Sequence, residues 1–128
     1  MNLLLDTHVF LWWDRRDRGL SEAAGALIAD PANQIFVSAA SVWEIAIKRR
    51  SGKLEFAGSP VAAIGTNGFH ELPILPADAE AAGALAWRHN DPFDRLLVAQ
   101  ARRLTFTLLT VDSVIRAYAG VVQLWAAA

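Results

Sequence analysis

Five short, largely apolar runs recur along the chain and set its expected architecture. A continuous apolar run of this length is typical of a strand that is buried on both faces of a parallel sheet. The third run contains Pro73, which favours an edge position because proline has no backbone N–H to donate. The predicted strands are residues 2–5, 35–38, 71–74, 105–109 and 121–124.

The segments between these runs carry helix signals. Ser21 and Asp91 are suited to cap two of the helices, and Thr7 can cap the first. Strands that alternate with helices indicate an α/β fold, in which helices cover both faces of a parallel sheet. No repeat, linker or composition break divides the chain, so a single domain over residues 1–128 is expected. The predicted helices are residues 8–15, 22–29, 39–50, a short helix from 60, 77–87, a helix from 92 to the fourth strand, and 113–118.

The stretch 90–101 combines a helix start with two carboxylates. Asp91 suits the N-cap, Pro92 suits the first helical position, and Asp94 falls in the first turn. Residues 96–101 form an almost wholly apolar helix body, so Asp94 is expected to be held rigidly at the end of a buried helix. From these residues alone, two interpretations stay open. The carboxylates either bind a metal ion or cap the helix and complement its dipole.

Three further acidic residues are expected close to Asp94. With the strand order 3-2-1-4-5, the first and fourth strands flank the crevice where such sheets bind ligands, and Asp6 and Asp112 follow these strands. Glu44 lies in the helix after the second strand, near enough to reach the same crevice. Each residue alone has a simpler interpretation as a cap, a loop residue or a solvated side chain. Those interpretations explain poorly why all four fall at one end of one sheet.

A cluster of carboxylates has a chemical consequence. Neighbouring carboxylates repel one another and raise each other's pKa values, and a divalent cation relieves that repulsion. The chain has no Cys, and oxygen ligands favour Mg²⁺ or Mn²⁺ over Zn²⁺. The predicted site therefore binds Mg²⁺, with Mn²⁺ as a substitute.

Composition narrows the class of protein only in part. The 54% of apolar residues, with five Trp, indicate that a partner or a second copy covers some apolar surface. Twelve basic and thirteen acidic residues give a net charge of −1, and without the four carboxylates the balance becomes twelve to nine. Net charge therefore decides nothing about nucleic acid. No membrane span or signal peptide is expected, and the lack of Cys fits a cytoplasmic protein.

Four blocks of sequence, taken in order, carry a resemblance to a known family. The blocks are LLLDTHV at residues 3–9, SAASVWEI at 38–45, HNDPFDRLLVAQA at 89–101 and LTVD at 109–112. With these blocks the chain resembles the PIN-domain ribonucleases of the VapC type, the toxins of bacterial type II toxin–antitoxin modules. The resemblance covers essentially the whole chain, its third block is highly specific, and residues 56–83 match only loosely.

The resemblance implies a fold, an activity and partners. It implies a three-layer α/β/α sandwich with about five mainly parallel strands, a homodimer, and a cognate antitoxin that inserts a segment into the active-site groove. It places the family's acidic quartet on Asp6, Glu44, Asp94 and Asp112. The implied activity is Mg²⁺-dependent hydrolysis of RNA to a 5′-phosphate and a 3′-hydroxyl by a metal-activated water. Asp6, Asp94 and Asp112 would hold the metal, and Glu44 would bind it directly or through water.

Other side chains are expected to assist. Thr7 and Thr110 adjoin the acidic residues and are expected to orient them. Arg95 and Lys48 are candidates to contact the RNA backbone, although basic residues at a helix end are often merely solvated. His89 is expected to cap or pack rather than to transfer protons, because metal-assisted hydrolysis does not require a His.

Two other enzyme classes and one non-enzymatic class share parts of this pattern. A phosphotransferase of the haloacid-dehalogenase type needs a second Asp where this chain has His8, and a receiver domain needs a Lys later than Lys53. A PIN-like module that binds RNA or protein without catalysis stays open, although an intact acidic quartet argues against it. Dependence of RNA cleavage on Mg²⁺ separates the nuclease from the binding module.

Overall fold

The computed structural model describes all residues from Met1 to Ala128 and has a five-stranded, fully parallel sheet at its centre. The strand order is β3-β2-β1-β4-β5, as the sequence predicts. In the register of the central strands, Leu5 lies beside Val37 on one side and Leu109 on the other. The strands are β1 (Asn2–Leu5), β2 (Gln34–Ser38), β3 (His70–Leu72), β4 (Thr107–Thr110) and β5 (Gln123–Trp125).

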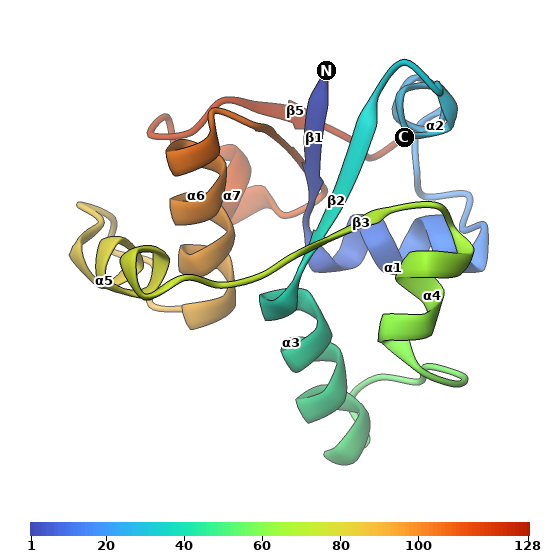
Figure 1. Ribbon diagram of the computed structural model, residues 1–128, viewed down its shortest axis with the longest axis horizontal. Helices are drawn as coiled ribbons and strands as arrows, with labels where there is room; N and C mark the ends of the chain where they lie inside the picture. Colours follow the sequence, from blue (N-terminus) through green and yellow to red (C-terminus); the bar gives the residue numbers. More distant parts are fainter.

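Helices cover both faces of this sheet and complete three layers. Alternate residues of β1 divide between the two layers, because successive side chains of a strand point to opposite faces. Leu3 and Leu5 pack with residues of α1, α2 and α4, whereas Leu4 packs with residues of α6 and α7. Figure 1 shows these two groups of helices on opposite sides of the strands. The helices are α1 (Thr7–Arg15), α2 (Glu22–Ala29), α3 (Ala39–Arg50), α4 (Pro60–Thr66), α5 (Pro76–Ala84), α6 (Pro92–Leu104) and α7 (Ser113–Arg116).

Several predicted element boundaries are wrong. The fourth strand begins at Thr107 rather than at residue 105, the fifth covers Gln123–Trp125 rather than 121–124, and α7 ends at Arg116 rather than at residue 118.

The fifth helix ends at Ala84 and not at residue 87. The carbonyls of Leu85 and Trp87 accept hydrogen bonds from the Arg95 side chain instead. The third strand is at the edge of the sheet, as predicted, but it ends at Leu72, so Pro73 lies just outside it.

The C-terminus also differs from expectation, since the sequence predicts a frayed tail from Trp125 onwards. Instead Trp125 ends β5, and Ala126 is fully buried. The Ala126 N–H donates to the carbonyl of Thr110, and its own carbonyl accepts from the Ser21 N–H, both at 2.8 Å. No helix of the structure is long and apolar enough to cross a membrane.

Candidate active site

Asp6 stands directly after β1, where the chain turns into α1. It is only 3% exposed, and it caps α1 by accepting a hydrogen bond of 2.7 Å from the Val9 N–H. The sequence predicts that Thr7 caps this helix, but its hydroxyl instead points to α3. Burial raises the pKa of the Asp6 carboxyl, although hydrogen bonds from Thr110, Val9 and Val111 act in the opposite direction. Asp6 is therefore a carboxylate fixed in place by backbone and side-chain donors.

Thr110 joins Asp6 to Asp112. Its hydroxyl donates to Asp6 Oδ2 at 2.5 Å and accepts from the Asp112 N–H at 3.0 Å. Asp112 follows β4 and caps the short helix α7, where its Oδ1 accepts from the N–H groups of Val114 and Ile115. The expected orienting role of Thr110 thus has a direct geometric basis, because one hydroxyl sets the distance between two acidic residues.

Glu44 lies on the second turn of α3 and is 4% exposed. The Thr7 hydroxyl donates to its Oε1 at 2.6 Å, and the Lys48 ammonium contacts its Oε2 at 2.7 Å. The hydrogen bond to Glu44 raises the pKa of Lys48, and the charges of Asp91 and Asp94 raise it further. Lys48 therefore lies in the field of three carboxylates contributed by two helices.

Asp94 lies in the first turn of α6, behind the cap formed by Asp91. Asp91 Oδ1 accepts from the N–H groups of Phe93 and Asp94, as the sequence predicts. The Asp94 carboxylate contacts His89 Nε2 at 2.6 Å. Burial raises the pKa of Asp94 to about 7, and the negative charges of Asp91 and Asp112 contribute to this rise.

The structure thus brings the predicted quartet to the carboxyl edge of the sheet. Thr110 connects Asp6 with Asp112, the charge of Asp112 acts on Asp94, and the charge of Asp94 acts on Lys48, which contacts Glu44. One group of three possible ligand residues has its ligand atoms all within 4.8 Å of one another, namely His89, Asp91 and Asp94, and Asp6, Glu44 and Asp112 lie outside it. The sequence does not predict this group, because His89 is expected to cap or pack and because the family resemblance places Asp91 outside the acidic quartet.

Comparison with known proteins identifies the family. The family model described as PIN domain matches residues 3–121. The chain belongs to the PIN domain family. It is also similar to Ribonuclease VapC22 of Mycobacterium tuberculosis, with 31% identity over 119 residues, which cover 91% of each chain.

Three solved structures share the fold. VapBC2 from Rickettsia felis, bound to a promoter DNA fragment, aligns with a TM-score of 0.69 at 14% identity, covering 97% of this chain and 98% of that one. A toxin–antitoxin complex from Klebsiella pneumoniae aligns with a TM-score of 0.64 at 19% identity, covering 94% and 95%. VapBC-1 from nontypeable Haemophilus influenzae aligns with a TM-score of 0.63 at 17% identity, covering 97% of each chain.

The side chains at the edge of this PIN domain fit a divalent cation by their chemistry. Asp6, Glu44, Asp94 and Asp112 offer hard oxygen donors from four separate elements, which suits Mg²⁺ or Mn²⁺. The pKa of Asp94 is raised to about 7 chiefly because the carboxyl is buried, and the negative charges of Asp91 and Asp112 add to the rise. A bound cation would stabilise the charged forms of these carboxylates.

Arg95 has a different role from the RNA contact expected of it. Its guanidinium donates to the carbonyls of two residues in the last turn of α5 and of three residues in the segment that follows, at distances between 2.7 and 3.4 Å. All five N–H donors of an arginine are thereby used, so none is left for a phosphate. Arg95 instead holds the segment that carries His89 against the start of α6. The accepting residues are Ala82, Gly83, Leu85, Trp87 and His89.

Replacing Arg95 should therefore weaken the fold. Arg95→Met keeps the aliphatic stem but removes every donor, and we expect the free energy of unfolding to fall by about 3 kcal/mol, because hydrogen bonds from a charged group are among the stronger ones. Urea denaturation followed by circular dichroism measures the change. Arg102→Met, on the exposed side of the same helix, is the matched control and should leave stability unchanged. Equal stabilities of the two variants would contradict this role.

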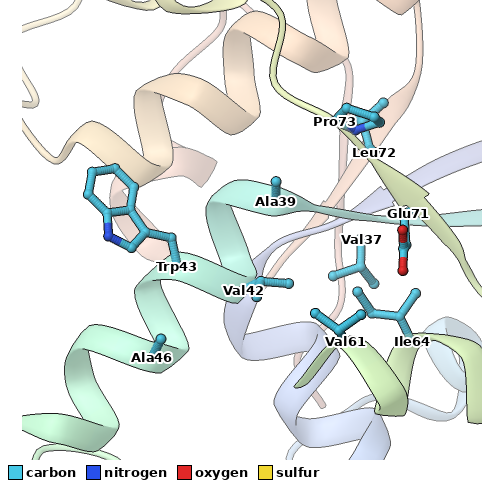
Figure 2. A pocket seen from close by; sticks show the side chains of 10 residues that line it. All are labelled: Val37, Ala39, Val42, Trp43, Ala46, Val61, Ile64, Glu71, Leu72 and Pro73. Atoms are coloured by element: carbon cyan, nitrogen blue, oxygen red, sulfur yellow. The ribbon is translucent and has the colours of Figure 1, made fainter. Parts of the chain in front are cut away.

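An apolar pocket of about 340 Å³ lies between α3, α4 and the end of β3 (Figure 2). Val42 of α3 points into it, opposite Val61 and Ile64 of α4, and Glu71 is its one ionisable lining residue. This pocket holds none of the quartet, so it is a separate surface from the acidic edge. Trp43, 54% exposed, lies on the α6 side of α3, with its ring centroid 5.1 Å from that of Phe93.

Proposed function

We propose that this PIN domain is a divalent-cation-dependent endoribonuclease and the toxin of a toxin–antitoxin pair. The observation that carries the proposal is the set of acidic residues at one sheet edge, where Asp94 has a pKa raised to about 7. Two comparisons support it, since one relative is named a ribonuclease and the structural neighbours include toxin–antitoxin complexes. A fold used only for binding would not need to keep mutually repelling carboxylates together.

The proposed roles follow from the contacts of each side chain. Asp6, Asp94 and Asp112 hold Mg²⁺, or Mn²⁺ in its place, and Thr110 keeps Asp6 and Asp112 in register. The cation, when bound, lowers the pKa of water and offsets the negative charge of the scissile phosphate. Hydrolysis of the P–O3′ bond would add the elements of water across it, so the expected products are a 5′-phosphate and a 3′-hydroxyl.

Glu44 and Lys48 act as a pair in this proposal. Both Glu44 oxygens accept hydrogen bonds from protein donors, so Glu44 reaches the cation through water and holds the Lys48 ammonium beside the carboxylates. The Lys48 side chain is 37% exposed, and its charge is free to meet a phosphate of the RNA backbone. Thr7 fixes the other oxygen of Glu44 and thereby the direction in which Lys48 extends.

A cognate antitoxin that inserts a segment into the active-site groove is the proposed protein partner, and the toxin–antitoxin complexes among the structural neighbours support it. The apolar pocket next to α3, with the exposed Val61 in its lining, offers that partner a further contact. A homodimer of the toxin is a further proposal, which light scattering of the purified chain tests. The RNA target and the antitoxin sequence require isolation of the complex from cells.

RNA cleavage with Mg²⁺ and with EDTA tests the proposed activity. The purified chain should cut RNA with Mg²⁺ or Mn²⁺, stop when EDTA is present, and leave ends that a 5′-phosphate-dependent exonuclease degrades. Binding of RNA that is equally strong in both conditions, with no cleavage in either, would identify a binding module and overturn the nuclease proposal.

A further inference from the structure

His89 makes the closest side-chain contact to Asp94. Its Nε2 lies 2.6 Å from Asp94 Oδ2, and the two side chains are 24% and 14% exposed. With Asp94 ionised, the carboxylate accepts and His89 Nε2–H donates. Asp94 Oδ1 accepts no hydrogen bond from the protein and is not buried, so it faces the solvent side of the site.

The position of His89 is set by groups that do not belong to the quartet. Its carbonyl accepts a hydrogen bond of 2.9 Å from Arg95, and its ring packs on Trp87 with centroids 4.9 Å apart. Trp87 in turn stacks on Tyr118 at 4.5 Å with an interplanar angle of 14°. The imidazole is therefore supported from its backbone and from one ring face, and its only polar side-chain contact is Asp94.

We propose that His89 is a positioning residue that holds Asp94 Oδ2, so that Oδ1 is the oxygen presented to the divalent cation. This inference rests on the proposed nuclease function and names a residue outside the acidic quartet that its metal site requires. A carboxylate that is free to rotate loses conformational entropy when it binds a metal, whereas one fixed by a hydrogen bond has already lost it. Hydrogen-bond partners of metal ligands contribute roughly ten- to a hundredfold to metal affinity.

Two variants separate positioning from packing. His89→Phe keeps a flat ring on Trp87 but removes the donor to Asp94. His89→Gln has no ring, yet its amide nitrogen can take the place of Nε2. If His89 acts only by packing, Phe should substitute better than Gln. If it acts by positioning, Gln should substitute better than Phe.

Mn²⁺ affinity, measured by electron paramagnetic resonance without RNA, is the main readout. We expect His89→Phe to weaken Mn²⁺ binding about ten- to a hundredfold, His89→Gln to restore most of the affinity, and kcat for RNA cleavage to follow the same order with little change in KM. His70→Phe is the matched control, because His70 also packs on an aromatic ring, 5.1 Å from Phe36, but lies in β3. It should bind Mn²⁺ like the wild type.

Melting temperatures in EDTA show whether each variant is folded, and His89→Gln keeps the test valid if His89→Phe is not. Wild-type Mn²⁺ affinity in a folded His89→Phe variant would overturn the positioning role, as would an equal loss in both variants. A wild-type protein that binds no Mn²⁺ would instead refute the proposed nuclease, and the role of His89 would fall with it.

Discussion

Asp94→Asn is expected to lower the rate of RNA cleavage by about a thousandfold or more. The substitution keeps the size of the side chain but removes the charge that binds the cation, and a loss of about 4 kcal/mol of transition-state stabilisation corresponds to that factor. The same change removes the repulsion from Asp91 and Asp112. In EDTA near pH 8, the variant should therefore unfold at the same temperature as the wild type or at a higher one.

A loss of activity without a loss of stability distinguishes this account from simple damage to the fold. Glu80→Gln, on the exposed surface of α5, is the charge-matched control and should change neither property. Cleavage is measured with a fluorescently labelled RNA, and stability by thermal melting in EDTA. An Asp94→Asn protein that cleaves RNA at the wild-type rate would remove Asp94 from the proposed site.

Stabilisation by Mn²⁺ should depend strongly on pH. Because the pKa of Asp94 is raised to about 7, a proton competes with the cation in the folded protein up to that pH. Between pH 8 and pH 5.5 the affinity should fall about thirtyfold, since each unit below the pKa weakens binding about tenfold. Mn²⁺ at a hundred times its dissociation constant adds about 2.7 kcal/mol to stability at pH 8, and the same concentration should add under about 1 kcal/mol at pH 5.5.

Without metal, stability depends on pH in the opposite direction and falls as the pH rises. The folded protein keeps the Asp94 proton up to about pH 7, whereas the unfolded chain releases it near its ordinary pKa of 3.8. The contribution of Asp94 to stability is therefore fully present below pH 3.8 and is lost as the pH rises through 7. Burial raises the pKa of Asp6 as well, which acts in the same direction. Melting curves in EDTA and in Mn²⁺ at both pH values test this, and equal Mn²⁺ stabilisation at pH 5.5 and pH 8 would contradict it.

Features set by local pattern could be predicted from the sequence. The apolar run before Asp6 gives a strand with its exact bounds, and Asp91 with Pro92 gives the start of α6. The alternation of strands and helices gives the parallel sheet, and the ends of β1 and β4 then bring Asp6 and Asp112 to one edge. In each case the deciding interaction involves residues near one another in sequence or a general rule of topology.

Features set by side chains that reach across the chain could not be predicted. Arginine is a common phosphate ligand, and only the fold shows that carbonyls at the end of α5 and just after it accept from all the donors of Arg95. Thr7 stands where a helix cap belongs, but its hydroxyl meets Glu44, 37 residues away. His89 precedes a cap motif, and its spacing alone does not decide whether it contacts Asp94 or the helix end. A His five residues before a candidate ligand was the one available signal.

The most direct test of the central claim is the anomalous scattering of Mn²⁺ in crystals grown near pH 8. The account predicts a peak at the carboxyl edge of β1 and β4, with oxygens of Asp94 and of Asp6 or Asp112 at about 2.2 Å, and with His89 still bound to the other Asp94 oxygen. A protein that binds Mn²⁺ elsewhere, or crystals without a peak at this edge, would contradict it.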